Sequence, residues 1–123
     1  MQRISKVGAL ISIPVSSLRR SLTFYGDKLG FSLQLRDDRL GWAELESDSR
    51  AVRIGLAEVQ EVKRGGPVLV IEVKDIEAAI KTLSELKVGA SEITDVKNIA
   101  RVATLEDPDR HLLMLRQSYQ RRD

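Results

Sequence analysis

One internal repeat constrains the fold more than any other feature of this sequence. The segment VSSLRRSLTFYGDKLGFSLQL begins at Val15, and a similar segment, VKDIEAAIKTLSELKVGASEI, begins 58 residues later at Val73. Each segment carries apolar residues at helical spacing, which predicts one amphipathic helix in each copy. These apolar positions are Leu18, Leu22, Tyr25 and Leu29 in the first copy, and Ile76, Ile80, Leu83 and Leu86 in the second.

The ends of both helices carry recognisable signals. The free amides of the first helical turn can donate to a side-chain oxygen just before the helix. Ser16 or Ser17 supplies this oxygen in the first copy, and Asp75 supplies it in the second. Gly30 and Gly89 follow the last apolar positions, so we expect the helices to end there.

Short extended runs surround each helix, one before it and three after it. Turn-forming Asp, Ser and Pro residues separate these runs. They are predicted at residues 8–15, 32–36, 40–46 and 51–56 in the first copy, and at 67–73, 92–96, 101–105 and 112–115 in the second. The fold class is therefore α+β, with two βαβββ modules in a single domain over residues 1–123. The modules cover about 1–63 and about 67–117, with a basic C-terminal tail over 118–123.

Alternation along the strands assigns the faces of the sheets. On the first and last strands of each module, the residues at one set of alternate positions are large and apolar, and we expect them to pack beneath the helices. These residues are Ile11, Ile13, Val52, Ile54, Leu56, Leu69, Ile71, Val73, Leu113 and Leu115. The opposite parity mixes polar and apolar residues. Such a face is typical of a cavity or an interface.

Composition excludes several kinds of chemistry. The 123 residues include no Cys and one His, which removes disulfides, thiolate metal sites, cysteine nucleophiles and two-histidine sites within one chain. Lys and Arg (20) nearly balance Asp and Glu (18), and both signs are interleaved, so no nucleic-acid partner is expected. Arg116, Arg121 and Arg122 form a basic end that we interpret as solvated.

The apolar stretch near the N-terminus is too short for a signal peptide or membrane span, which predicts a cytoplasmic protein with no membrane partner.

Two motifs give the repeat a family resemblance. They are the run Ser21-x-x-Phe24-Tyr25-x-x-x-Leu29-Gly30-Phe31 and the turn Glu106-Asp107-Pro108-Asp109 before the last strand. Together with the repeated module they resemble the vicinal oxygen chelate superfamily, which contains glyoxalase I, bleomycin-resistance proteins, fosfomycin-modifying enzymes and extradiol dioxygenases. The resemblance covers nearly the whole chain and implies a U-shaped mixed sheet in a homodimer. One departure is Arg110, which stands where the family's turn commonly has Gly.

Metal-using members of that superfamily hold a divalent ion with one ligand from the first strand and one from the last strand of each module, usually His and Glu. The resemblance puts these ligand positions at Leu10, Gly55, Val68 and Met114. Hydrocarbon and thioether groups are poor ligands for such ions. We therefore expect no metal and no other cofactor, which disfavours glyoxalase, fosfomycin-transferase and dioxygenase activities.

The candidate ligand-binding residues lie on the mixed faces of the strands: Leu10, Ser12, Trp42, Glu44, Arg53, Gly55, Val68, Val70, Glu72, Arg101, Met114 and Arg116. Trp42 is either a core residue or a platform for a ligand. Glu44 and Glu72 could pair with Arg53, Arg101 or Arg116 and are candidates for a general acid or base, but structural ion pairs between subunits explain the same residues and are the preferred interpretation. His111 lies on a turn, with the wrong parity for the cavity, and is interpreted as a structural residue.

The leading functional hypothesis is metal-independent binding of a small organic ligand, aromatic or amphipathic and neutral or anionic, as in drug or toxin sequestration. One alternative is a metal-independent isomerase or lyase that uses Glu44 or Glu72, so the sequence leaves open whether the protein is an enzyme. A second alternative is a degenerate scaffold for protein association. Changing both glutamates to Gln separates the first two, because turnover would be lost while binding would persist.

Overall fold

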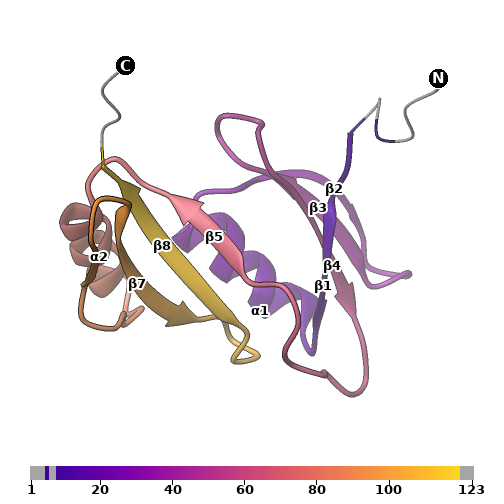
Figure 1. Ribbon diagram of the computed structural model, residues 1–123. Coiled ribbons are helices and arrows are strands. Elements are labelled where there is room, and N and C mark those ends of the chain that lie inside the picture. The colour runs from indigo at the N-terminus through magenta and orange to yellow at the C-terminus, as the bar shows by residue number, and fades with distance from the viewer. Residues whose placement is uncertain (1–4, 6–7, 120–123) are drawn as a thin grey trace. The chain divides into compact units, whose positions relative to one another are not determined.

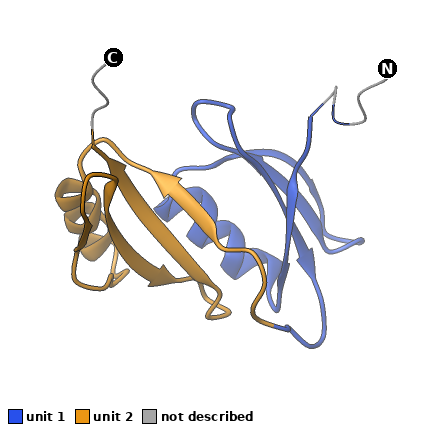
Figure 2. Cartoon of the chain, in the orientation of Figure 1, with its two compact units in different colours: residues 1–63 blue, residues 64–123 orange. Residues whose placement is uncertain are grey.

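The computed structural model describes Ser5 and residues 8–119. The chain divides into two compact units, one ending at Lys63 and the other beginning at Arg64 (Figure 2). Each unit holds one four-stranded mixed sheet and one helical region (Figure 1). The α+β class and the two βαβββ modules expected from the repeat are confirmed.

The first unit, unit 1, contains β1 (Ile11–Val15), α1 (Leu18–Leu22), the π-helical turn η2 (Thr23–Lys28), β2 (Ser32–Asp37), β3 (Trp42–Glu46) and β4 (Arg53–Glu58). Its strand order is β1-β4-β3-β2, with β1 parallel to β4 and the other pairs antiparallel. The Ser17 hydroxyl caps α1 by accepting from the Arg20 amide (3.2 Å). The Glu58 carboxylate accepts from the Leu18 amide at 2.8 Å and satisfies another free donor of the first turn.

The predicted first helix is not α-helical throughout. Beyond Leu22 the backbone widens into η2, and the Leu29 amide bonds the Phe24 carbonyl five residues back (3.0 Å). Gly30 then adopts a left-handed conformation (φ +86°) and ends the helix, as expected.

The second unit, unit 2, contains β5 (Leu69–Glu72), α2 (Ile76–Glu85), β6 (Thr94–Val96), β7 (Ala100–Glu106) and β8 (Leu112–Ser118), with strand order β5-β8-β7-β6. The Asp75 side chain caps α2 by accepting from the Ala78 amide (3.0 Å), as predicted. The Gln117 side-chain oxygen accepts from the Ile76 amide (2.8 Å), a role that Glu58 has in unit 1. β8 extends through Ser118, the first residue of the expected tail, and Arg121 and Arg122 lie outside the described residues.

The C-terminal end of α2 differs from the prediction. Lys87, not Gly89, adopts the left-handed conformation (φ +66°). The Val88 amide bonds the Leu83 carbonyl (2.8 Å) and the Lys87 amide bonds the Ser84 carbonyl (3.0 Å), which is a Schellman motif. Val88 and Leu83 are both buried, as is usual in this motif, and the helix ends at Glu85, four residues before Gly89.

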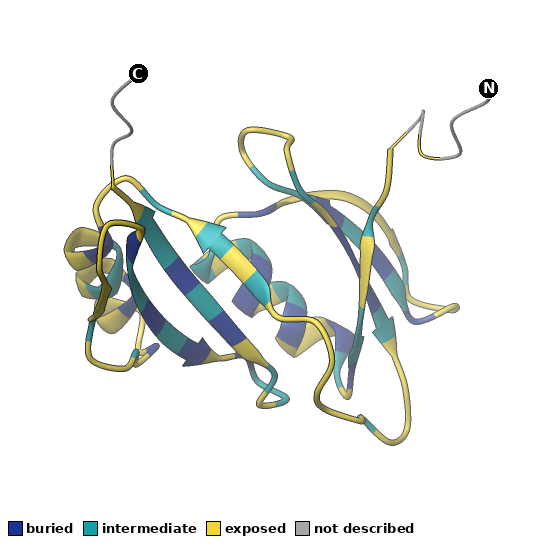
Figure 3. Cartoon of the chain, in the orientation of Figure 1, coloured by how far each residue is buried: buried dark blue, intermediate teal, exposed yellow. Residues whose placement is uncertain are grey.

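The helix-covered faces of the sheets form the cores. Side chains along β7 and β8 alternate between buried and partly exposed (Figure 3). The buried side chains include Tyr25, Leu45, Ile54 and Leu56 in unit 1, and Ile76, Leu105, Leu113 and Leu115 in unit 2. The predicted apolar parity is therefore confirmed in β4 and β8. Ile11 is an exception at 48% exposed, because it begins the edge strand β1.

One turn design recurs before the last strand of each unit. The Asp107 side chain accepts from the His111 amide (2.8 Å), and the Ser47 hydroxyl accepts from the Val52 amide (3.1 Å). Both turns place an arginine at positive φ, Arg110 at +68° and Arg50 at +63°. Arg110 therefore occupies the left-handed position for which glycine is favoured.

Candidate functional site

Each sheet has a second face, the helix-free face, that its own helix does not cover. In unit 1 the strand register aligns four residues across this face. Ser12 of β1 is paired with Gly55 of β4, Gly55 with Glu44 of β3, and Glu44 with Leu35 of β2. Three of these residues, Ser12, Glu44 and Gly55, are sequence-predicted site residues, and the register brings them into one row. Leu10 precedes β1 on the same edge of the sheet.

Trp42 and Gly55 fit together on this helix-free face. A Cβ built on Gly55 would lie 2.1 Å from Trp42 Cη2 and 2.6 Å from Cζ2, so the six-membered ring of the indole occupies the space of the missing side chain. Trp42 is partly buried, and the alternate residues Ala43 and Leu45 are buried beneath the helix. Trp42 therefore belongs to the helix-free face and not to the core under α1.

Glu44 links Trp42 to Arg53. Its Oε2 atom accepts from the indole nitrogen of Trp42 at 2.8 Å, and its Oε1 atom accepts from Arg53 Nη2 at 3.2 Å. Both carboxylate oxygens are thus engaged by donors on the same face. The ion pair balances the charges of Glu44 and Arg53, and the hydrogen bond from the ring nitrogen to Glu44 holds the indole in one orientation.

Unit 2 has a similar arrangement on its own helix-free face. Glu72 Oε1 accepts from Arg116 Nη1 at 2.6 Å, and Glu72 Oε2 accepts from the Ser118 hydroxyl at 3.0 Å. Val70 is paired with Met114, and Met114 with Thr104, so these side chains continue the face beside the ion pair. The pairings with arginine that the sequence suggested for Glu44 and Glu72 form within each unit.

Apolar side chains on the helix-free face of unit 2 are well exposed. Val70 is 41% exposed, and Leu112, which shares the parity of Met114 in β8, is 48% exposed. Val68, two residues before Val70, is also 41% exposed. Because water contact with apolar surface is unfavourable, this face is suited to an apolar ligand or partner.

Arg101 does not belong to this face, contrary to the prediction. In β7 the buried residues Ala103 and Leu105 point toward α2, and Arg101 shares their parity. Its Nη2 atom donates to Glu77 Oε1 of α2 at 2.7 Å, and this bond raises the pKa of the guanidinium further above its usual value. Its long side chain runs along the helix side of the sheet while its charge stays at the surface.

Several residues of these faces were not among the predicted site residues. They are Leu35 in unit 1 and Val102, Thr104 and Ser118 in unit 2. Once β7 is paired with β8, parity alone places Val102 and Thr104 beside Arg116 and Met114. Leu35 lies on the helix-free face because of a β-bulge at Gln34, and nothing in the sequence indicates this bulge.

Comparisons with known proteins identify the family. The model of the Glyoxalase/Bleomycin resistance protein/Dioxygenase superfamily matches residues 7–115. The chain belongs to this superfamily. The resemblance stated from the two sequence motifs is thereby confirmed. The comparison with curated proteins gave no match.

Solved structures of other proteins share the fold over almost the whole chain. An integron cassette protein, HFX_CASS4, from the mobile metagenome of the Halifax Harbour sewage outfall has 25% identity and a TM-score of 0.79, covering 90% of this chain and 99% of that one. TnmS3, an antibiotic binding protein from Streptomyces sp. CB03234, has 21% identity and a TM-score of 0.78, covering 93% and 98%. A superfamily member from Sphaerobacter thermophilus DSM 20745 has 20% identity and a TM-score of 0.74, covering 90% and 98%.

The residues at the positions that the resemblance assigns to metal ligands do not fit a divalent ion. Gly55 lies under the Trp42 ring, and Leu10, Val68 and Met114 offer only hydrocarbon or thioether. The neighbouring carboxylates, Glu44 and Glu72, have both oxygens engaged by other donors. Within Ser5 and residues 8–119, no three or more His, Asp or Glu residues cluster as metal ligands would.

In that same part of the chain, no helix is long and apolar enough to cross a membrane.

Proposed function

We propose that the helix-free faces bind a small, flat and mainly apolar organic molecule without the help of a metal ion. The observation that carries this proposal is the Trp42, Gly55 and Glu44 arrangement. The indole is held over Gly55 and tied by its ring nitrogen to Glu44, so its orientation is set before any ligand arrives. Such preorganisation lowers the entropy lost on binding.

Charge on these faces favours a neutral ligand. Arg53 is paired with Glu44 and Arg116 with Glu72, so neither arginine offers an unbalanced positive charge to an anion. An anionic ligand would have to compete with a carboxylate already in place. The apolar side chains of Val70, Leu112 and Met114 give the ligand a surface that favours dispersion contacts over ionic ones.

The hydrogen bonds of both glutamates favour binding over acid–base catalysis. A general base needs a carboxylate oxygen free to reach the substrate proton. The oxygens of Glu44 are held by Trp42 and Arg53, and those of Glu72 by Arg116 and Ser118. Glu44 and Glu72 therefore act as positioning residues in this proposal.

A homodimer is part of the proposal. The exposed apolar side chains of Val70 and Leu112 need a covering surface, and a second copy of the chain offers one that also encloses a ligand. The antibiotic binding protein TnmS3 shares this fold, which supports sequestration of a small toxic molecule as the biological role. The predicted cytoplasmic location belongs to the same proposal.

Trp42 provides a direct test, because it is the chain's single tryptophan. Its indole N–H gives one identifiable signal in a nitrogen–proton correlation spectrum. Titration with 2-naphthol, a neutral flat probe, should shift this signal saturably. Titration with 2-naphthoate, which has the same ring system and a negative charge, should shift it less. Absence of a saturable shift with 2-naphthol would refute binding at this face.

A charge variant makes the test sharper. Glu44→Gln retains an acceptor for the indole but removes the negative partner of Arg53, so 2-naphthoate should gain affinity relative to 2-naphthol. Glu85→Gln, at an exposed position of α2 in the other unit, is the matched control and should leave the ratio unchanged. An equal effect of both variants would mean that overall net charge, not Arg53, controls the preference.

A further inference from the structure

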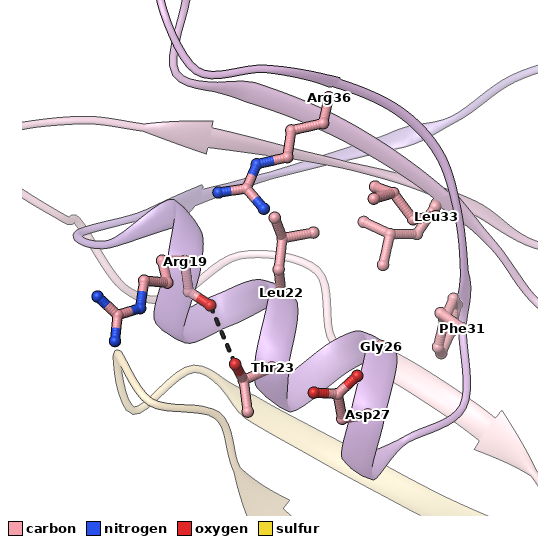
Figure 4. A pocket seen from close by; sticks show the side chains of 9 residues that line it. Arg19, Leu22, Thr23, Gly26, Asp27, Phe31, Leu33 and Arg36 are labelled. Carbon is pink, nitrogen blue, oxygen red and sulfur yellow. Dashed lines mark hydrogen bonds between the residues drawn. The ribbon is translucent and has the colours of Figure 1, made fainter.

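A hollow of about 330 Å³ opens on the other side of the first sheet, between the helical region and the edge strand β2. This volume is at the lower end of the range for small-molecule sites. Figure 4 shows its lining, which includes Arg19, Leu22, Thr23, Asp27, Phe31 and Arg36. All of its lining residues belong to unit 1, and none is part of the helix-free face.

The π-helical turn forms one wall of the hollow. Thr23, Gly26 and Asp27 all belong to η2 and all line it. π-helical turns are rare and are often found at functional sites, because the wider turn displaces side chains from their usual positions. Gly26 adds no side chain to the wall, which leaves the space beside Phe31 open.

A β-bulge forms the opposite wall. Leu33 of β2 is paired with Leu45, Leu35 with Glu44, and Arg36 with Ala43, so the extra residue Gln34 breaks the alternation. Without the bulge, Leu33 and Leu35 would share a face, and Arg36 would lie on the other one. With it, Arg36 shares the helix side of β2 with Leu33 and extends toward the helix (Figure 4). Bulges re-aim side chains in this way near binding sites.

The charges of the hollow are separated along its length. Arg19 belongs to α1 and Asp27 to η2, eight residues further along the helical region, and Figure 4 shows them at different ends of the hollow. In Figure 4, Arg36 lies on the Leu22 side of the hollow, away from Phe31. One end is therefore cationic, the middle is apolar and the other end carries a carboxylate.

Both arginines have donors to offer. The guanidinium of Arg19 has no ion-pair partner among the residues that the structure describes. Arg36 is ion-paired with Asp38 through its Nε atom (2.8 Å), so its charge is balanced, but its terminal nitrogens still carry four further N–H donors. Arginine forks of this kind match the two oxygens of a carboxylate.

We propose that this hollow binds a small amphipathic monocarboxylate. The charge of Arg19, which is unpaired among the described residues and whose guanidinium extends away from Arg36 in Figure 4, attracts the carboxylate, which accepts hydrogen bonds from the terminal N–H groups of Arg36. The apolar body packs on Leu22 and Phe31, and Asp27 rejects a second negative charge at the far end. This site is independent of the proposed function, because it uses the opposite side of the first sheet.

Hexanoate, its uncharged analogue 1-hexanol and the dicarboxylate adipate are suitable probes. Amide signals of Thr23, Gly26 and Arg36 should shift saturably with hexanoate, with a dissociation constant of about 1 mM for so small a ligand. Adipate should bind more weakly, and Asp27→Asn should remove this preference. The Trp42 indole signal, which reports the helix-free face, should stay in place and so separates the two sites.

Arginine variants decide the role of the charges. Arg19→Gln and Arg36→Gln should each weaken hexanoate binding about three- to tenfold while leaving 1-hexanol unchanged. Arg20→Gln is the matched control, since Arg20 follows Arg19 but bonds Ser16 and does not line the hollow. The proposal is overturned if hexanoate produces no saturable shift at these amides, shifts only the helix-free face, or loses as much affinity in Arg20→Gln as in Arg19→Gln.

Discussion

Replacing Gly55 by Ala probes the contact on which the candidate site depends. The backbone of Gly55 is not in the left-handed region, so alanine meets no backbone penalty there. The new Cβ would instead lie 2.1 Å from Trp42 Cη2, where carbon atoms normally stay about 3.5–4.0 Å apart. The indole must therefore move by about 1.5 Å, which breaks its 2.8 Å hydrogen bond to Glu44.

The size of the effect follows from three contributions. Overpacking of this kind costs about 1–3 kcal/mol, and loss of the hydrogen bond costs about 1 kcal/mol. Replacing a strand glycine by alanine returns about 0.5–1 kcal/mol through the lower entropy of the unfolded chain. We therefore expect Gly55→Ala to lower the free energy of unfolding by about 2 kcal/mol.

Urea unfolding followed by circular dichroism measures this change, and a double-mutant cycle identifies its cause. In a Trp42→Ala background the clash is absent, so Gly55→Ala should be neutral or slightly stabilising. The coupling between the two positions should then be about 2–3 kcal/mol. Gly89→Ala, where an added Cβ meets nothing within 4 Å, is the control and should not destabilise. If Gly55→Ala destabilises equally with and without the indole, the packing of Trp42 on Gly55 is not the reason.

Four other changes test local features of the fold. Ser21→Ala should stabilise by about 1 kcal/mol in thermal unfolding, because the buried Ser21 hydroxyl has no hydrogen-bond partner in the described structure; a loss of stability would contradict this. Lys87→Gly should stabilise by a similar ~1 kcal/mol by relieving the positive φ, and no gain would mean that the Schellman turn carries no strain. Glu58→Ala should cost about 1 kcal/mol, since it removes a cap from α1, and Glu58→Gln should restore most of it. The Tyr119 hydroxyl donates to Asp95, and this bond raises the pKa of Tyr119 above 10.0. The bond therefore adds stability up to about pH 10, and this stability is lost as the pH rises through the pKa of Tyr119 in the folded state. Asp95→Asn should lower the pH midpoint of tyrosinate formation measured by ultraviolet absorbance, and an unchanged midpoint would exclude the bond.

Local chemistry made much of the fold predictable. Ser17 and Asp75 cap the helices because their short side chains reach the free amides, and this depends only on neighbouring residues. The apolar parity of β4 and β8 followed from the period of two in a strand with one buried face. Ile54 and Leu113 are buried where this alternation put them.

Features that depend on strand pairing or on competing local preferences were not predictable. The apolar residues from Leu18 to Leu29 follow the period of an α-helix, and nothing in that spacing indicates a π-helical turn, so η2 was missed. The end of α2 follows the burial of Val88 and not the preference of Gly89. Arg101 was assigned to the wrong face because only the pairing of β7 with β8 fixes its parity. The hollow was missed because it depends on the bulge at Gln34.

Native mass spectrometry of the purified protein tests the central claim, metal-independent binding of a small organic molecule, most directly. Spectra recorded under gentle and then denaturing conditions give the number of subunits, the metal content and the mass of any bound molecule. We expect a metal-free dimer that carries a small organic molecule from purification or takes up added 2-naphthol in stoichiometric amount. A divalent ion bound stoichiometrically would contradict the assignment of Leu10, Gly55, Val68 and Met114 as positions unable to hold a metal.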